Sequence, residues 1–161
     1  MRHYLDTFKD ASCFSFSAWV NTRVDSVDGR IMSVLETARS NDTGKDLALW
    51  LDKDHSFGYA GAARFVNSSG DDLRTGEYAS NGVLNEWQMV LFEVYRDGIS
   101  IWADGVLYDE KSTTGSFDFD KWDQLQIARL WGSTTNAYYP GWMSTVRITP
   151  YPRKDRAGFE Y

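Results

Sequence analysis

The chain has 161 residues and a formal net charge of −6 at pH 7, with 42% hydrophobic and 25% charged residues. This length suits one soluble domain with a sizeable core. The chain is acidic and has no basic patch, so it lacks the positively charged surface by which proteins bind nucleic acids. The same acidic charge argues against binding to an anionic membrane. A neutral sugar, a cation or a protein remains compatible as the partner.

Export and redox signals are sparse. Cys13 is the single cysteine, so the chain has no internal disulfide framework. No apolar run is long enough to span a bilayer, and the first 13 residues lack the apolar segment of a signal peptide. We expect that the protein either is not exported by a signal peptide or has lost one.

Alternating apolar residues dominate the chain, whereas no segment shows sustained helical periodicity. In chain order, this pattern predicts strands at 14–20, 30–37, 47–52, 57–66 (one or two strands with glycine breaks), 87–95, 99–103, 125–131 and 143–149. Because Gly, Asn and Asp tolerate positive φ, four dipeptides predict tight turns: Asp28-Gly29, Asn81-Gly82, Asp97-Gly98 and Asp104-Gly105. The last two bracket a short strand and predict a three-stranded meander.

Many short strands at this spacing predict an all-β fold in which two antiparallel sheets form a sandwich or jelly roll. Trp19, Trp50 and Trp102 fall in the phase opposite to the apolar residues. The apolar phase is expected to face the interior between the sheets: Phe14, Phe16, Ala18, Val20, Leu47, Leu49, Leu51, Val90, Phe92, Val94, Ile99, Ile101, Leu125, Ile127, Val146 and Ile148.

Three stretches, in this order, resemble the laminin-G-like jelly rolls of the concanavalin A-like lectin/glucanase superfamily. They are "FSFSAWV" (14–20), "NEWQMVLFEVYRDGISIWADGVLYDE" (85–110) and "LQIARLWGSTTNAYYPGWMSTVRITPYPR" (125–153). The resemblance implies one domain over residues 1–161, with a core at 14–150 and terminal segments at 1–13 and 151–161. It also implies that one of the two antiparallel sheets is concave, and that Trp19 has a structural role as part of the "AWV" signature.

The resemblance is incomplete at two places. Family members often begin with an additional strand, but only thirteen residues precede Phe14, so we expect that strand to be short or absent. Ser144 and Thr145 stand where the family often has an acidic pair, which weakens the inference of calcium binding.

Catalysis is not expected. The related retaining glycosidases need two carboxylates about 5 Å apart, and this chain lacks their Glu-x-Asp-x-Glu run. Glu93 and Asp97 have a suitable spacing, but Asp97 lies in a predicted turn. Asp118 and Asp120 alternate with phenylalanines, and a solvated strand or loop explains them better than a catalytic pair.

Binding is the better hypothesis, because aromatic rings on an open sheet can stack on sugars while neighbouring polar groups fix the hydroxyls. Trp50 with Asp52, and Trp102 with Asp104, fit this chemistry on the floor of the concave sheet, and Gln126 shares their phase. The alternative is that loops cover the two tryptophans, which then only pack.

A second aromatic group lies in the predicted loop "WGSTTNAYYPGW" (131–142), and loops often carry recognition. Trp131, Tyr138, Tyr139 and Trp142 suit either a sugar or a protein interface. The alternative is that some of them fill the rim of the sandwich.

No cofactor is firmly predicted, and calcium is the open candidate. "SNDTGKD" (40–46) and "NSSGDD" (67–72) offer clustered oxygen ligands. Ordinary polar turns have the same composition.

These features predict a non-catalytic recognition module that serves as a surface attachment or decoration protein of a larger assembly such as a phage particle. A glycan is a further candidate ligand of this module. Its expected partners are a protein or further copies of itself, at a virion surface or outside the cell. A sheet edge left free by the absent first strand, with the tail 151–161 docked on a neighbour, motivates this reading. The alternative is a carbohydrate-binding module of a secreted polysaccharide-active system, and a glycoside hydrolase is the least favoured hypothesis.

Overall fold

The computed structural model describes residues 13–24, 29–35, 47–52, 58–66, 72–80, 83–112, 124–128 and 138–150. No helix in these ranges is long and apolar enough to cross a membrane. The ranges contain ten strands: β1 (Cys13–Thr22), β2 (Gly29–Leu35), β3 (Leu47–Asp52), β4 (Gly58–Val66), β5 (Asp72–Ser80), β6 (Gln88–Tyr95), β7 (Gly98–Ala103), β8 (Val106–Ser112), β9 (Gln124–Ile127) and β10 (Gly141–Thr149).

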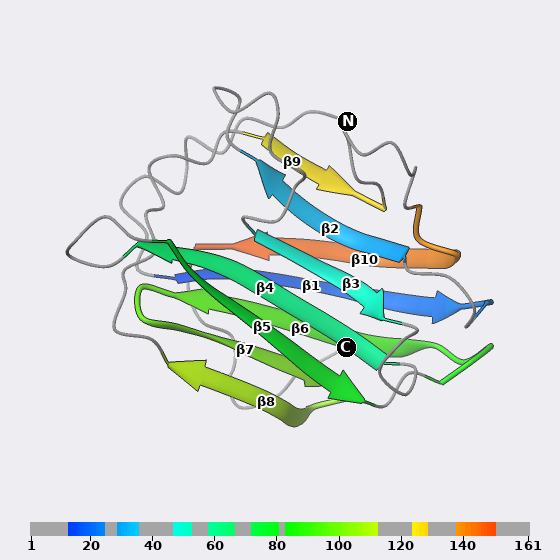
Figure 1. The fold of residues 1–161 in the computed structure, drawn as a ribbon. Helices are drawn as coiled ribbons and strands as arrows, with labels where there is room; N and C mark the ends of the chain where they lie inside the picture. Colours follow the sequence, from blue (N-terminus) through cyan, green and yellow to red (C-terminus); the bar gives the residue numbers. More distant parts are fainter. Residues whose placement is uncertain are drawn as a thin grey trace.

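The strands form two five-stranded sheets, which lie one in front of the other in Figure 1. The first sheet has the order β10-β1-β6-β7-β8, and the second has the order β5-β4-β3-β2-β9. Every strand pair in both sheets is antiparallel. The predicted antiparallel sandwich is therefore confirmed.

The core lies between the two sheets and follows the predicted phase of β1, β6 and β7. The inward apolar side chains of β1, β6 and β7 are at most 2% exposed, for example Phe16 and Phe92. The second sheet contributes Ile31, Met32, Leu49 and other side chains to the same cluster. Because burial of apolar area is the dominant stabilising term, alternation along each strand fixes which face turns inward.

Gly61 lets the two sheets approach each other closely. A Cβ atom at this position would lie 2.6 Å from Cε2 of Phe92 and 3.0 Å from Cδ1 of Ile101. The glycines of this segment do not break it, because β4 is one continuous strand. Gly61 is therefore a packing residue rather than a turn residue.

The predicted meander is β6-β7-β8, with short turns between the strands. Asp104 and Gly105 have φ angles of 49° and 79°, as expected for a two-residue turn with left-handed central residues. Gly98 serves a different purpose, because it lacks a positive φ and its Cβ would collide with the carbonyl oxygen of Lys111 on β8. The other two predicted turns lie wholly or partly outside the described residues.

Two predicted interior residues are partly exposed. Ile127 is 38% exposed, and it lies at the end of an edge strand, followed by Ala128 with φ 59°. Val146 is 36% exposed, beside an irregularity in the β1–β10 register and next to Thr145 with φ 50°. A bulge adds a residue to one strand, so simple alternation fails there.

The end of β9 and the presence of β5 also differ from the sequence prediction. β9 ends at Ile127 instead of residue 131, because the left-handed Ala128 terminates the extended backbone. β5 was not predicted, since "DLRTGEYAS" is polar and lacks apolar alternation. Its position at the edge of the second sheet explains why it needs few apolar residues.

The burial of Tyr139 is expected to make the domain less stable as the pH becomes alkaline. Its hydroxyl lies 2.6 Å from Oγ1 of Thr22, and burial raises the pKa of Tyr139 to about 12. Burial also raises the pKa values of Tyr59 and Tyr95. Because the unfolded tyrosines ionise first, the tyrosine contribution to the free energy of unfolding should be fully present below about pH 10 and be lost as the pH rises above that value.

Urea unfolding at a series of alkaline pH values measures this dependence. Tyr139→Phe should reduce the slope by up to about 1.4 kcal/mol per pH unit, the contribution of one ionising group. Tyr138→Phe makes the same substitution at the exposed neighbour and is the matched control. An unchanged slope in Tyr139→Phe would contradict the assignment.

Candidate binding site

The two tryptophans that were predicted to bind a sugar together, Trp50 and Trp102, lie on different sheets. Trp50 is in β3 of the second sheet, and Trp102 is in β7 of the first sheet. The prediction that they share the floor of one concave sheet is therefore wrong. Alternation along a strand indicates which residues share a face, but it does not reveal which sheet the strand joins. The side chains of Trp50 and Asp52 lie outside the described part of the structure.

Trp102 and Asp104 hold the first sheet together. Trp102 is half-buried, and its Nε1 donates a hydrogen bond to Oγ of Ser100 over 3.1 Å. The Asp104 carboxylate accepts one from the backbone N–H of Met89 over 2.8 Å and one from Nε2 of Gln88 over 3.3 Å. Asp104 thus anchors the β7–β8 turn to β6, while sugar binding by Trp102 and Asp104 stays a prediction.

The middle of the outer face of the first sheet is closed to solvent. Glu93 is fully buried there. Its Oε2 accepts hydrogen bonds from the hydroxyls of Tyr95 over 2.8 Å and Ser100 over 3.1 Å, and its Oε1 accepts one from Ser15 over 3.3 Å. Asp97 is exposed in the β6–β7 turn. Glu93 and Asp97 therefore do not form an accessible acid–base pair.

The remaining predicted aromatic residues have different environments. Tyr139 is buried in the core, whereas Tyr138 and Trp142 are exposed. Gln126 is half-buried opposite Ser33 in the second sheet. Trp131 lies outside the described residues, so its predicted role remains untested.

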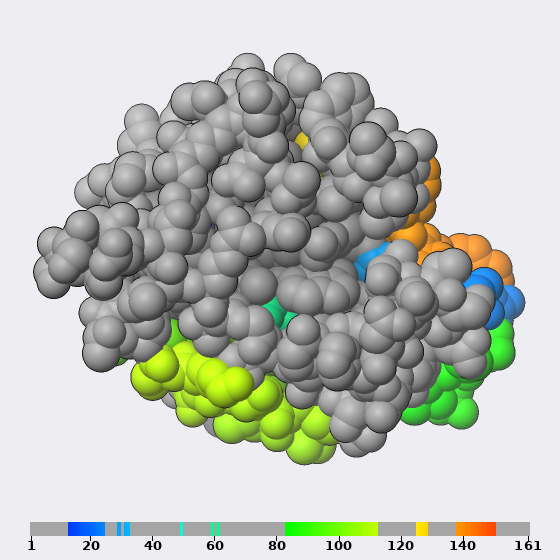
Figure 2. Space-filling model, in the orientation of Figure 1, coloured from blue at the N-terminus to red at the C-terminus, as the bar shows by residue number. Residues whose placement is uncertain are grey.

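Three chain segments far apart in sequence meet at one end of the first sheet. The backbone N–H of Arg23, after β1, donates to the carbonyl of Pro140 over 2.9 Å, just before β10. The N–H of Asn85, before β6, donates to the carbonyl of Thr22 over 2.9 Å. The three segments lie side by side at the right-hand edge of Figure 1, and Figure 2 shows them as orange, blue and green atoms.

Gly141 is required for this close meeting of β1 and β10. A Cβ atom at this position would collide with the carbonyl oxygen of Asn21. Gly29 has a similar role, because its Cβ would collide with Cδ of Pro140. Both sites need the space that only glycine leaves.

We call the polar and aromatic residues gathered here the rim patch; its members are Asn21, Arg23, Asn85, Trp87 and Trp142. Asn21 is paired with Trp142 across β1 and β10. Val20 is paired with Gln88 at the end of the β1–β6 ladder, and Trp87 directly precedes Gln88. Trp87 and Trp142 thus belong to the two segments that flank the end of β1.

The rim patch is open at its tryptophans and closed at its centre. Trp142 is 55% exposed and Trp87 is 46% exposed, whereas Asn21 is only 4% exposed. The Cζ atom of Arg23 lies 4.0 Å from the centroid of the Trp142 ring. Nη1 of Arg23 also donates to Oδ1 of Asn85 over 2.8 Å. These contacts fix the position of the guanidinium group and one face of the Trp142 ring.

The amide oxygen of Asn21 has no hydrogen-bond partner within the part of the chain that the structure describes. An unsatisfied buried acceptor costs about 1–3 kcal/mol. Because the atom is itself enclosed, a ligand could donate a hydrogen bond to it and remove that cost only after the side chains around Asn21 move. The rim patch therefore combines a buried acceptor in need of a donor with two exposed aromatic rings.

Sequence reasoning found Trp142 but missed the other members of the rim patch. Asn21 follows Trp19 in the outward phase of the same strand, and Trp87 shares the outward phase of its own strand. The sequence alone therefore indicated that Asn21 and Trp87 each point outward. However, joining residues 21, 87 and 142 requires the pairing of β1 with both β6 and β10, which alternation does not predict.

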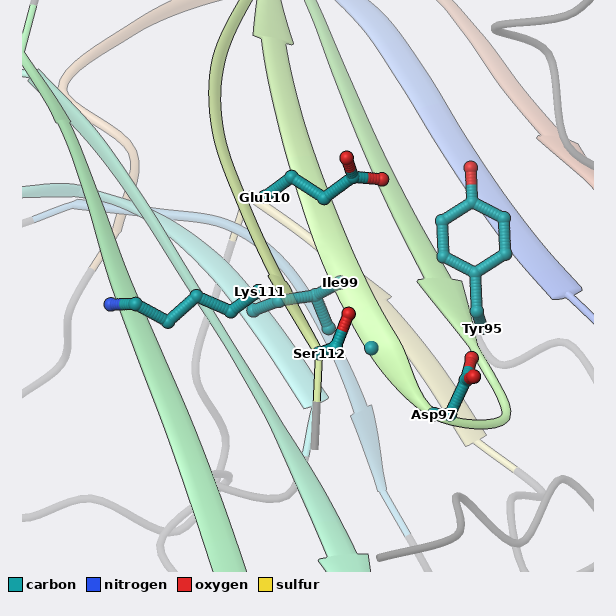
Figure 3. A pocket seen from close by; sticks show the side chains of 7 residues that line it. Tyr95, Asp97, Ile99, Glu110, Lys111 and Ser112 are labelled. Atoms are coloured by element: carbon teal, nitrogen blue, oxygen red, sulfur yellow. The ribbon is translucent and has the colours of Figure 1, made fainter. Parts of the chain in front are cut away.

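A shallow pocket of about 190 Å³ lies at the opposite end of the first sheet, beside the β6–β7 turn. Figure 3 shows Tyr95, Asp97 and Glu110 around it, with the Lys111 side chain pointing away. The described residues contain no group of three or more His, Cys, Asp or Glu side chains suited to a metal ion. The calcium segments 40–46 and 67–72 lie almost wholly outside those residues, so calcium binding stays a prediction.

A laminin G family model, described as the concanavalin A-like lectin/glucanases superfamily, matches residues 3–156. The chain belongs to this superfamily. The resemblance in the three sequence stretches is thereby confirmed, and the jelly-roll type of the sandwich with it. No curated protein sequence matches this superfamily member.

Several solved structures are similar in fold. The CBM40 of the Ruminococcus gnavus IT-sialidase, bound to α2,3-sialyllactose, has a TM-score of 0.67 at 13% identity, with 96% of this chain and 88% of that chain covered. Domains LG4-5 of the mouse laminin α1 chain have a TM-score of 0.64 at 15% identity, with 97% and 40% covered. A proposed carbohydrate-binding protein from Bacteroides ovatus ATCC 8483 has a TM-score of 0.64 at 18% identity, with 94% and 40% covered.

These identities are low, so the similarity demonstrates a shared fold. The chain spans 40% of the length of the Bacteroides ovatus protein and of the laminin fragment. It corresponds to one module of such longer chains.

Proposed function

We propose that this superfamily member is a non-catalytic carbohydrate-recognition module and that the rim patch is its binding site. The observation that carries the proposal is the buried amide oxygen of Asn21, which has no hydrogen-bond partner among the described residues, at the same end of the sheet as the exposed Trp87 and Trp142. Aromatic rings offer apolar area for the faces of a sugar ring, and a buried amide orients one of its hydroxyls. The same arrangement lacks the paired carboxylates that glycoside hydrolysis needs.

Proteins of similar fold support the proposed ligand class. The Ruminococcus gnavus CBM40 is bound to sialyllactose, and the Bacteroides ovatus protein is a proposed carbohydrate binder. This support is an analogy at the level of the fold, since unrelated functions occur on one fold. The place of binding in this chain rests on its own residues.

Attachment within a larger assembly such as a phage particle remains a prediction. It depends on the terminal segments, and residues 1–12 and 151–161 lie outside the described part of the chain. Location at a virion surface or outside the cell likewise remains a prediction. A carbohydrate site on the rim patch is compatible with either setting.

The decisive test is a glycan array of the wild-type domain compared with Trp142→Ala. We expect wild-type binding to at least one glycan and a loss of at least about tenfold in affinity for the variant, as for an aromatic hot spot. Leu107→Ala removes an exposed apolar side chain from the distant β8 and should bind as the wild type does. The proposal fails if no glycan binds or if Trp142→Ala keeps full affinity.

A further inference from the structure

Arg23 is a fixed and accessible cation within the rim patch. Its side chain is exposed, but the hydrogen bond to Asn85 and the contact with the Trp142 ring restrain it. Since a guanidinium group has five N–H donors, most of them remain available after the bond to Asn85. The donors therefore stand ready in one place before a ligand arrives.

Arg23 makes no ion pair with a carboxylate among the residues that the structure describes. Asn85 contacts it through a neutral amide, and the nearest acidic residue along that segment, Glu86, is exposed and not bonded to it. The charge of Arg23 is thus available to a ligand anion.

We propose that the rim patch selects acidic saccharides, with the carboxylate or sulfate of the sugar bound by Arg23. The inference rests on the proposed function, because it names the ligand class of the same site. Arginine binds planar anionic groups through two parallel hydrogen bonds. The acidic group would take these donors while a neighbouring hydroxyl donates to Oδ1 of Asn21.

The three recognition elements place complementary demands on the ligand. The rings of Trp87 and Trp142 require an apolar sugar face, Asn21 requires a hydrogen-bond donor, and Arg23 requires an acceptor with negative charge. A sugar with an acidic substituent beside a free hydroxyl meets all three demands. A neutral sugar leaves the charge of Arg23 unused.

Titration calorimetry with lactose, 3′-sialyllactose and 3′-sulfated lactose tests the inference. We expect both acidic sugars to bind at least tenfold more tightly than lactose, and the two acidic sugars distinguish a carboxylate from a sulfate preference. Arg23→Gln should remove this difference between the acidic sugars and lactose. Arg96→Gln removes the same charge from the distant β6–β7 turn and should leave the preference intact.

Salt gives a second readout. Raising NaCl from about 50 to about 500 mM should weaken binding of the acidic sugars more than that of lactose, because exposed charges are screened. Arg23→Lys keeps the charge but loses the two-pronged hydrogen bonding, so it should keep the salt dependence at reduced affinity. The thermal midpoint of each variant shows whether it is folded.

Two results separate the inference from the proposed function. If lactose and the acidic sugars bind equally in a Trp142-dependent manner, and Arg23→Gln changes neither affinity, the acidic preference is overturned while carbohydrate recognition stands. If neither an array glycan nor these three sugars bind, or if binding is insensitive to Trp142→Ala, the proposed function fails and the inference fails with it.

Discussion

Glu93→Ala is expected to lower the free energy of unfolding by at least about 2 kcal/mol, because the buried hydroxyls of Ser15 and Ser100 each lose an acceptor. Both carboxylate oxygens of Glu93 accept hydrogen bonds in a fully buried position. Without them, the hydroxyls of Ser15, Tyr95 and Ser100 lose an acceptor, and each unsatisfied buried group costs about 1–3 kcal/mol. Since domains are stable by about 5–15 kcal/mol, this is a large fraction of the total.

Equilibrium unfolding in urea measures this effect, and Glu110→Ala is the matched control. Glu110 lies opposite Ser100 on the neighbouring β8, but it is exposed. Its replacement should change the stability by no more than about 0.5 kcal/mol. Equal urea midpoints for the two variants would show that the buried hydrogen bonds to Glu93 contribute little.

Phe92→Ala should be similarly destabilising, by about 3–5 kcal/mol, because it leaves a cavity in the middle of the core. Phe92 is fully buried, and its ring occupies the space where a side chain at position 61 would lie. Gly61→Ala should cost about 1–3 kcal/mol for the opposite reason, since its Cβ would overlap the Phe92 ring.

The double variant Gly61→Ala/Phe92→Ala tests whether these two effects share one cause. Without the Phe92 ring, the methyl group added at Gly61 occupies the vacated space. The loss of stability in the double variant should therefore be smaller, by at least about 1 kcal/mol, than the sum of the losses in the two single variants. Leu107 is exposed and far from Gly61, so Leu107→Ala is the control. The losses of stability caused by Leu107→Ala and Gly61→Ala should add within about 0.5 kcal/mol. Additivity between Gly61 and Phe92 would disprove the close packing.

The sequence predicts the local features of this fold well, and the reason is physical. Period-two alternation has one cause, a buried face, and it placed β1, β6 and β7 with their core residues. The Asp104-Gly105 turn was predictable because positive φ favours these residue types. Where alternation is interrupted by a bulge, as beside Val146, the prediction fails.

The candidate site was much less predictable, because it depends on which strands become neighbours. Trp50 and Trp102 have similar local sequences but belong to different layers. Glu93 sits in an outward phase and is nevertheless buried, which composition alone does not indicate. Arg23 and Asn85 became candidates only after their contacts with each other and with Trp142 were known.

The separation of Asn21, Trp87 and Trp142 along the chain makes the rim patch a late product of folding. β1 pairs with β10 across more than one hundred residues, for example Ser15 with Thr149, and such distant pairing is slow to form. A nascent or partly folded chain would therefore have no binding site. A bound ligand would in turn stabilise the folded sheet by mass action, because it binds only when β10, β1 and β6 are already neighbours.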